Sequence, residues 1–206
     1  MSIREKLFEF LFNIFIRNFP EKHTKCLDVW CGKWLFLEKL FKYWYTNVEW
    51  LDWFYAPENK EILFTKNDFS QKIEKQNEQY ECVFLLDVIE HVQNQYILLD
   101  EIHRILKKDG VLFLTTPNIY SFPWKLYFLF RDRLWGFNEA QVSNKPRLSP
   151  GHINPFILNI FLEFYSDKFE LIEKYHYGFI IPIIHKFIWI DSKFLSGNLI
   201  LILRKK

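Results

Sequence analysis

The chain has 206 residues, of which half are hydrophobic and a quarter are charged, so we expect a folded domain with a core rather than a disordered or low-complexity chain. Its 27 Lys and Arg residues against 25 Asp and Glu residues give a net charge of +2, which does not suggest binding to a nucleic-acid backbone. The three cysteines have neither the spacing of a disulfide framework nor that of a metal site, which favours a reducing, cytoplasmic setting.

The N-terminal segment is apolar on most faces but is interrupted by polar residues. Residues 7–19 are fewer than the roughly 20 apolar residues that a membrane span needs, and they lack the small-residue cleavage site of a signal peptide. We therefore expect a helix within residues 1–20 that packs on the domain and ends at Pro20, in preference to an interfacial membrane anchor.

From Lys25 onward, strand patterns alternate with helix patterns. Short apolar runs predict strands at residues 26–29, 47–52, 61–65, 80–86 and 111–115. Helical periodicity covers residues 35–43 and 96–107, and Asp109-Gly110 is expected to stop the second helix. This alternation predicts an α/β fold with a parallel sheet and helices on both faces.

The C-terminal part breaks the alternation. Residues 169–177 and 198–203 predict two more strands, and the last one has no helix after it, which suggests an antiparallel strand added at the edge of the sheet. Without a repeat or a linker, the chain is expected to form a single domain. Its expected parts are the N-terminal helix, a first half over residues 25–118, an aromatic-rich insertion over 118–154, and a helix with sheet-edge strands over 155–206.

Acidic residues lie at the ends of successive predicted strands. Ligands of an open parallel sheet bind beyond the carboxyl ends of its strands, so Asp28 and Asp52 are expected near a ligand. Asp52 follows Gly32 by 20 residues, the spacing at which a carboxylate accepts hydrogen bonds from ribose hydroxyls. A helix-capping role is the alternative for both carboxylates. Because they end consecutive strands, we favour nucleotide binding.

Five stretches in register carry a family resemblance: residues 27–34, 48–52, 87–92, 99–110 and 116–118, with 151–156 as a further match. Together they resemble the class I S-adenosylmethionine-dependent methyltransferases, in the subgroup that includes the ubiquinone-biosynthesis-type O-methyltransferases. The resemblance implies a Rossmann-like, doubly wound sheet of seven strands, mostly parallel, with an antiparallel last strand. It also implies S-adenosylmethionine as cofactor and methyl transfer to an oxygen, or a nitrogen, of a small-molecule, glycan or lipid-linked acceptor.

The same resemblance assigns residues to the cofactor. The turn after the first strand would hold the methionine part of the cofactor. The end of the second strand would hold the ribose and flank one side of the adenine. The end of the third strand would bind the adenine amine, and the end of the fourth strand would close the site. In chain order the assigned residues are Asp28, Trp30, Cys31, Gly32, Asp52, Trp53, Asp68, Phe69, Leu86 and Asp87. No cluster of His, Cys, Asp or Glu has metal-site spacing, so no required metal is expected.

Methyl transfer to a hydroxyl needs an aligned acceptor and a group that removes its proton. His91 follows the fourth strand and is the leading candidate for this base, because the ordinary pKa of histidine lies near neutral pH. The alternative is a ring that hydrogen-bonds the backbone at a helix N-terminus. His152 belongs to the insertion and could reach over the site, or it could only order the loop of residues 151–155.

The first turn departs from the family pattern, because Trp30 and Trp34 stand where relatives have glycine, and so do Trp44 and Trp50. Glycine permits a positive φ and a close approach to the ligand. The chain has 6 Gly and 8 Trp, whereas average usage would give about 14 Gly. We interpret these Trp residues as glycines of the living protein, encoded by UGA in a bacterium that reads this codon as glycine. The alternative is a divergent, non-catalytic domain with impaired cofactor binding.

Two apolar stretches, residues 122–137 and 179–190, have no assigned partner. They are expected either to form a lid that shapes the acceptor pocket or to make a peripheral membrane contact through which a lipid-linked acceptor enters. A nicotinamide-dependent oxidoreductase shares the first strand–turn–helix pattern. It lacks the Glu90-His91 and 116–118 segments, so we do not favour it.

Overall fold

The computed structural model describes residues 3–29, 36–52, 61–67, 72–132, 134, 152–181, 186–188 and 191–206. Its helices are α1 (Ile3–Asn18), α2 (Phe36–Lys42), the short 3-10 helix η1 (Ile89–His91), α3 (Gln95–Ile105), α4 (Phe122–Arg131) and α6 (Leu158–Tyr165). Its strands are β1 (Cys26–Val29), β2 (Val48–Asp52), β3 (Leu63–Lys66), β4 (Tyr80–Leu86), β5 (Leu106–Pro117), β6 (Phe169–Tyr177), β7 (Phe179–Ile181), β8 (Lys186–Ile188) and β9 (Asn198–Lys205).

Seven strands form one sheet in the order β3-β2-β1-β4-β5-β9-β6. The first five strands of the chain pair in parallel, and β9 is antiparallel to both β5 and β6. This confirms the predicted Rossmann-like sheet with an antiparallel last strand. The predicted position of that strand was wrong, because β9 lies between β5 and β6 and β6 forms the edge. Residues 199–203 are buried without interruption, as a strand covered on both faces requires, whereas β6 has exposed positions.

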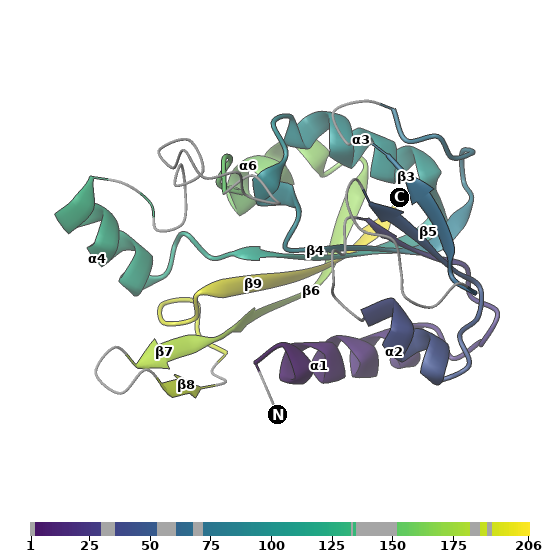
Figure 1. Ribbon diagram of the computed structural model, residues 1–206. Coiled ribbons are helices and arrows are strands. Elements are labelled where there is room, and N and C mark those ends of the chain that lie inside the picture. Colours follow the sequence, from purple (N-terminus) through teal and green to yellow (C-terminus); the bar gives the residue numbers. More distant parts are fainter. Residues whose placement is uncertain are drawn as a thin grey trace.

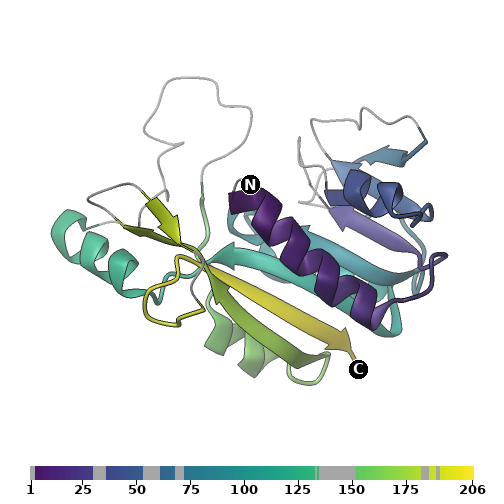
Figure 2. The same cartoon turned by 90° about the horizontal axis from the view of Figure 1, so that it is seen from below.

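Helices cover both faces of the sheet, as predicted. Figure 1 shows the sheet nearly edge-on, with α3 and α6 on one side and α1 and α2 on the other, and Figure 2 shows α1 lying across the strands. Successive residues of β9 alternate between the two cores: Leu201 packs in the cluster with α3 and α6, and Ile202 packs in the cluster with α1 and α2. Two apolar layers therefore hold the parallel strands, and their carboxyl ends remain at one edge of the sheet.

The boundary between α3 and β5 differs from the prediction. The helix was expected to run to Lys107 and to stop at Asp109-Gly110, but it ends at Ile105. Leu106 already has an extended backbone and pairs with Tyr80 of β4, while the Nζ atom of Lys205 donates to its carbonyl at 2.8 Å. Tertiary pairing with β4 and β9 thus ends the helix before the local stop signal.

The predicted insertion contains α4, which projects beyond the left end of the sheet in Figure 1, beside the hairpin of β7 and β8. None of the described α4 side chains is buried. Within the part of the chain that the structure describes, no helix is both long and apolar enough to cross a membrane.

Candidate active site

The carboxyl ends of β1 and β2 carry two of the predicted site residues. Asp28 lies in β1 beside Trp50 of β2, Asp52 is the last residue of β2, and both carboxylates are fully buried. The backbone N–H of Asn67, just after β3, donates to the carbonyl oxygen of Asp52 at 3.2 Å. The buried amide oxygen of Asn67 accepts no hydrogen bond from the described residues. These strand ends therefore gather buried acceptors that suit the hydroxyls and amine of a nucleoside.

The end of β4 has an unusual backbone. Asp87 follows Leu86 with φ 54°, in the left-handed region that few residues other than glycine adopt. Thr115 of β5 holds this conformation: its hydroxyl donates to the Asp87 carboxylate at 2.8 Å, and its carbonyl oxygen accepts from the Asp87 backbone N–H at 3.0 Å. This conformation and the two contacts with Thr115 fix the position of the Asp87 side chain at the carboxyl end of β4.

The other residues assigned to the cofactor, namely Trp30, Cys31, Gly32, Trp53, Asp68 and Phe69, lie outside the described residues. Those assignments stay predictions. Among the described residues, the structure brings Asp28 and Asp52 together at neighbouring strand ends and places Leu86 and Asp87 at the end of the adjacent strand β4.

The two histidines proposed from sequence meet. The rings of His91, at the end of η1, and His152, before α6, are 4.8 Å apart between centroids and inclined by 67°. Residues that follow His152 are tied to η1, because the backbone N–H groups of Ile153 and Asn154 both donate to the carbonyl oxygen of Glu90, at 2.9 and 3.1 Å. The structure thus places His152 beside His91, past the end of β4, and its reach over a bound ligand stays a prediction.

Asn154 completes the attachment of this segment to the rim of the sheet. Its side-chain nitrogen donates to the carbonyl oxygens of Val92 and Gln93, each at 2.7 Å, and its own carbonyl oxygen accepts from Gln95 at 3.1 Å. Order in residues 152–155 therefore comes from the contacts of Asn154 and from the backbone N–H of Ile153. Here, the order in the loop is what brings His152 to His91.

Glu90 is a site residue that the sequence analysis missed. Its side chain is 1% exposed, its Oε2 atom accepts from the hydroxyl of Thr116 at 3.2 Å, and its Oε1 atom lies 4.0 Å from Nε2 of His152. Burial and the nearby Asp87 raise the pKa of the Glu90 carboxyl well above its usual value. A signal was present in the sequence: an acidic residue three positions after Asp87, facing the Thr115-Thr116 pair of the neighbouring strand.

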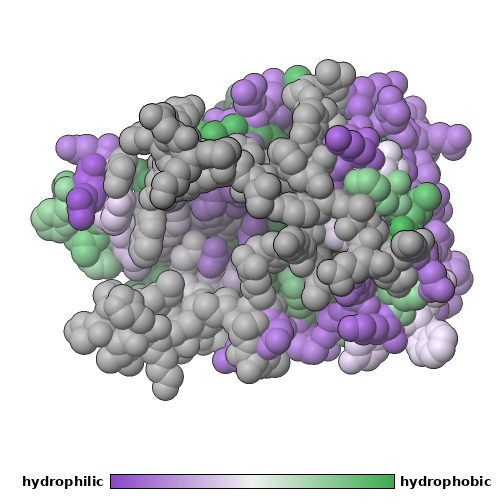
Figure 3. Space-filling view, in the orientation of Figure 1, coloured by the Kyte–Doolittle hydropathy of each residue, from purple (hydrophilic) through white to green (hydrophobic). Residues whose placement is uncertain are grey.

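The electrostatics of the cluster favour the uncharged form of His152. Burial and the neighbouring His91 lower the pKa of His152 to about 4. Because this value is far below 7, the His152 ring is neutral, and a neutral imidazole has one nitrogen atom that can act as an acceptor or a ligand. Figure 3 shows the surface hollowed left of its centre, in the region where Figure 1 draws the left-hand ends of β5 and β9.

Comparison with known proteins identifies the family of this chain. The family model described as "Methyltransferase domain" matches residues 3–158, which include every site residue described above. The chain belongs to the methyltransferase domain family. The methyltransferase fold and S-adenosylmethionine as its cofactor follow from this membership. No curated protein matches the sequence.

Solved structures share the fold of this methyltransferase at low sequence identity. A putative sarcosine dimethylglycine methyltransferase from Galdieria sulphuraria is 14% identical, with a TM-score of 0.64, over 98% of this chain and 88% of that one. A SAM-dependent methyltransferase from Archaeoglobus fulgidus is 17% identical, with a TM-score of 0.60, over 100% and 95%. One from Mesorhizobium loti is 12% identical, with a TM-score of 0.58, over 92% and 95%. At these identities the likeness shows the fold alone.

Proposed function

We propose that this methyltransferase acts on a hydroxyl oxygen of an acceptor bound against the His91–His152 pair. The observation that carries the proposal is the meeting of these two rings at the carboxyl end of β4, directly after Asp87. Acceptor and donor must meet at that edge, because the cofactor of a Rossmann-like sheet binds beyond the carboxyl ends of its strands. When bound, S-adenosylmethionine supplies an already activated methyl group.

The described residues then have distinct roles. Asp52 accepts hydrogen bonds from the ribose hydroxyls, and Asn67 offers its amide oxygen to the nucleoside. Asp87, fixed by Thr115, borders the space between cofactor and acceptor. A neutral imidazole of the His91–His152 pair can accept the proton of an acceptor hydroxyl, whereas a nitrogen acceptor that is already unprotonated needs no such base. The pair therefore favours an oxygen acceptor.

Cofactor binding is tested by calorimetric titration with S-adenosylmethionine and with its demethylated product. Replacing Asp52 by Asn removes charge-assisted hydrogen bonds, so we expect binding to weaken by about tenfold or more. Asp109→Asn is the matched control, because this residue lies in β5 with a positive φ that Asn also tolerates. Equal affinities of the two variants would remove Asp52 from the site.

The rival function, a non-catalytic domain with impaired cofactor binding, depends on Trp30 and Trp34. A chain with glycine at both positions is expected to bind the cofactor, and the chain with Trp at both positions to bind far more weakly. Methyl transfer by the glycine form, measured with a radiolabelled methyl group and a panel of hydroxylated acceptors, supports the enzyme. If neither form binds the cofactor, the rival function is correct.

Among the acceptor classes, we propose a lipid-linked one, because α4 exposes an apolar face. Phe128, Leu129 and Phe130 are more than half exposed, and Lys125 and Arg131 supply positive charge on the same helix. Figure 3 shows this helix as a hydrophobic group of atoms at the far left of the molecule. An exposed apolar helix with basic residues is the pattern of a helix that lies in a membrane interface.

Flotation with vesicles that contain anionic lipid tests this contact. The native chain should float with the vesicles, and a chain with Leu129→Ser and Phe130→Ser should remain at the bottom of the gradient. A matched control, Leu63→Ser on the exposed side of β3, should float like the native chain. If the native chain does not associate with such vesicles, the acceptor is a water-soluble small molecule or glycan.

A further inference from the structure

Three side chains with metal-ligating atoms converge at the rim of the sheet. One such atom from each of Glu90, His91 and His152 can be chosen so that all three lie within 4.8 Å of one another. Two of the three residues are adjacent in sequence and the third is distant, which is why sequence spacing did not indicate a metal site. The group occurs where the acceptor is expected, beside Asp87 and Thr116.

The Glu90 carboxylate points into this group. It is 1% exposed, and its Oε2 atom accepts a hydrogen bond from the Thr116 hydroxyl. The Oε1 atom is buried, accepts no hydrogen bond from the described residues, and faces Nε2 of His152 at 4.0 Å. Buried carboxylates are normally paired with a cation or coordinate a metal, and no Lys or Arg pairs with Glu90 among the described residues.

The geometry is close to that of a metal centre. Three protein ligands at about 2.1 Å from a tetrahedral ion are separated from one another by roughly 3.4 Å. The ligand atoms of Glu90, His91 and His152 lie within 4.8 Å of one another, and the Glu90 Oε1 and His152 Nε2 atoms, at 4.0 Å, are somewhat wider apart than this. His152 can close the difference by rotating, because its side chain is 27% exposed. The backbone of the neighbouring Ile153 and Asn154 stays attached to η1.

We propose that Glu90, His91 and His152 bind a divalent transition-metal ion, and that Zn²⁺ is the best chemical match. Two imidazoles and one carboxylate with an open fourth position form a ligand set of catalytic zinc sites. Mg²⁺ prefers oxygen ligands in an octahedral arrangement, which two imidazole nitrogens do not provide. The sequence-based expectation of no required metal is thereby revised.

The open position would take the oxygen of the acceptor hydroxyl; this role rests on the proposed methyl transfer, whereas ion binding does not. Coordination lowers the pKa of the hydroxyl, and its proton passes to solvent water; with the ion bound both imidazoles are ligands, so the ion takes over the part of the imidazole base in the proposed function. The oxygen then forms a bond to the methyl carbon as the bond from that carbon to the donor sulfur breaks. The sulfonium leaves as a neutral thioether, so charge and atoms balance.

Zn²⁺ titration of the full chain by calorimetry tests the site. We expect the native chain to bind about one equivalent, and Glu90→Gln and His152→Ala to weaken binding by at least about tenfold. His103→Ala on α3 is the matched control, because His103 lies outside the cluster and should leave Zn²⁺ binding unchanged. Equal affinity of Glu90→Gln, His152→Ala and the native chain would overturn the proposal.

Two further readouts keep the result interpretable. Co²⁺ added to the native chain should give the visible absorption of a tetrahedral centre, so the site is tested even if a variant does not fold. Absence of both this spectrum and Zn²⁺ binding would refute the metal site. Titration with the demethylated cofactor product is done separately. Cofactor binding without metal binding overturns the metal site and leaves the function standing, and the reverse result overturns the function alone.

A second observation concerns Trp44 at the end of α2. The backbone N–H of Trp44 donates to the carbonyl oxygen of Phe41 at 2.9 Å, and that of Tyr45 donates to the carbonyl oxygen of Leu40 at 3.1 Å. These are the two hydrogen bonds of a Schellman motif, and Leu40 and Tyr45, at its C3 and C″ positions, are both buried in the same apolar cluster. Trp44 occupies the C′ position, which is usually glycine, and has φ 71°.

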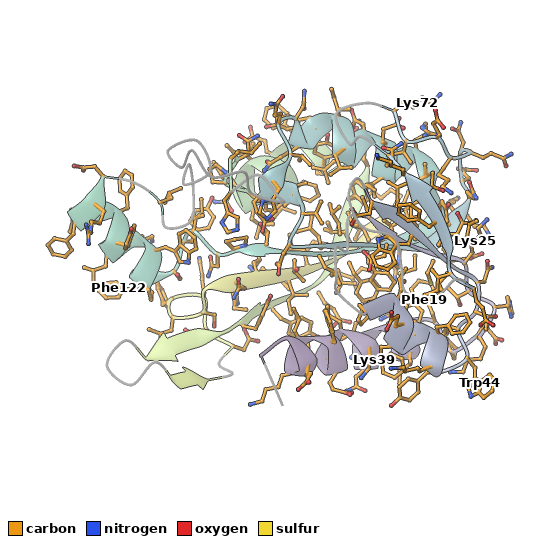
Figure 4. All side chains as sticks on the ribbon, in the orientation of Figure 1. Phe19, Lys25, Lys39, Trp44, Lys72 and Phe122 are labelled. Carbon is orange, nitrogen blue, oxygen red and sulfur yellow. The ribbon has the colours of Figure 1, made fainter. Side chains whose placement is uncertain are left out.

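The Trp44 side chain does not offset this strain. It is 77% exposed and projects away from α2, as Figure 4 shows. A bulky residue in the left-handed region is a genuine outlier, whereas Asp, the residue at three of the five non-glycine positive-φ positions in the described part of the chain, tolerates it better. Trp50 adds a second discordance, because its buried Nε1–H has no hydrogen-bond partner among the described residues.

We infer that residue 44 is glycine in the native protein, and that its codon is UGA read as glycine. The same reassignment accounts for Trp30, Trp34 and Trp50, since all four stand at family glycine positions. The codon at position 44 decides the inference: UGA supports it and UGG overturns it. The mass of the peptide that contains residue 44, isolated from the native organism, gives the same decision at the protein level.

A stability measurement tests the structural premise independently. In the recombinant Trp44 protein, Trp44→Gly should raise the Tm by about 2–4 °C relative to Trp44→Ala, because only glycine relieves the positive φ. Alanine controls for loss of the indole ring. A Tm for Trp44→Gly that does not exceed that of Trp44→Ala would show that the C′ position does not require glycine, and the inference would fail.

Discussion

Helices α3 and α4 have similar lengths and similarly amphipathic sequences, but their surroundings are opposite. α3 buries Leu98, Leu99, Ile102 and Ile105 against the sheet, and the Asn94 side chain caps its N-terminus by accepting from two backbone N–H groups at 3.1 Å. α4 buries none of its described side chains, and Ser121 at its N-terminus makes no capping hydrogen bond. Apolar periodicity thus predicts a helix and an apolar face, but it does not tell what covers that face.

The largest expected effect comes from matched leucines in the two helices. Leu99 is 2% exposed and Leu129 is 71% exposed. Leu99→Ala should lower the free energy of unfolding by roughly 2–5 kcal/mol, because it leaves a cavity in the core. Leu129→Ala should change it by less than about 0.5 kcal/mol. Chemical denaturation measures both values, and a large loss for Leu129→Ala would show that α4 is covered in the folded chain.

Buried and exposed charged side chains are expected to differ in their contribution to stability in the same way as buried and exposed leucines. Burial would raise the pKa of Glu49, but hydrogen bonds from Lys75, Tyr80 and Lys25 outweigh it and lower the pKa below its usual value. Stability from this carboxylate is therefore present above its unfolded pKa of about 4.3 and is lost as the pH falls through the lower folded value.

Glu49→Gln should accordingly cost about 2 kcal/mol at pH 7, since it leaves the buried ammonium group of Lys75 without its counter-charge. The difference from the native chain should shrink as the pH falls below 4. The control is Glu170→Gln, which removes an exposed pair with Arg204 and should cost less than about 1 kcal/mol at any pH. Denaturation curves at a series of pH values are required, and a pH-independent gap for Glu49→Gln would contradict the assignment.

The smallest effect is expected at the helix N-termini. Asn94→Ala removes two hydrogen bonds to the first turn of α3 and should cost about 1 kcal/mol. Ser121→Ala at α4 should be neutral or slightly stabilising, because the buried Ser121 hydroxyl has no hydrogen-bond partner among the described residues. Thermal unfolding distinguishes the two variants. A comparable loss for Ser121→Ala would mean that its hydroxyl has a structural role.

Sequence patterns predicted the fold well where each strand is decided by its own residues. The runs at 26–29 and 169–177 are strands with the expected bounds, and Asp52 ends β2 as expected. Prediction failed where distant pairing decides: Leu106 leaves α3 because Tyr80 and Lys205 hold it. The position of β9 inside the sheet also depends on β6, which no local pattern indicates.

The site residues also divide into those that local sequence predicts and those that depend on distant contacts. The chain order of strands was enough to predict that His91 stands at the carboxyl end of β4. The place of His152 in the insertion made it a second candidate. Glu90 was missed because its importance comes from burial against Thr116 of the next strand. Its position three residues after Asp87 is visible in the sequence, whereas this burial is not.

The attachment of Ile153 and Asn154 to the carbonyl oxygen of Glu90 has an evolutionary consequence. The chain leaves the sheet at Pro117, and next to His152 it is again held by these two hydrogen bonds. The segment between Pro117 and His152 can therefore change in length and composition without moving the His152 imidazole. Selection for a new acceptor can then change the sequence of that segment while the positions of His91 and His152 are conserved.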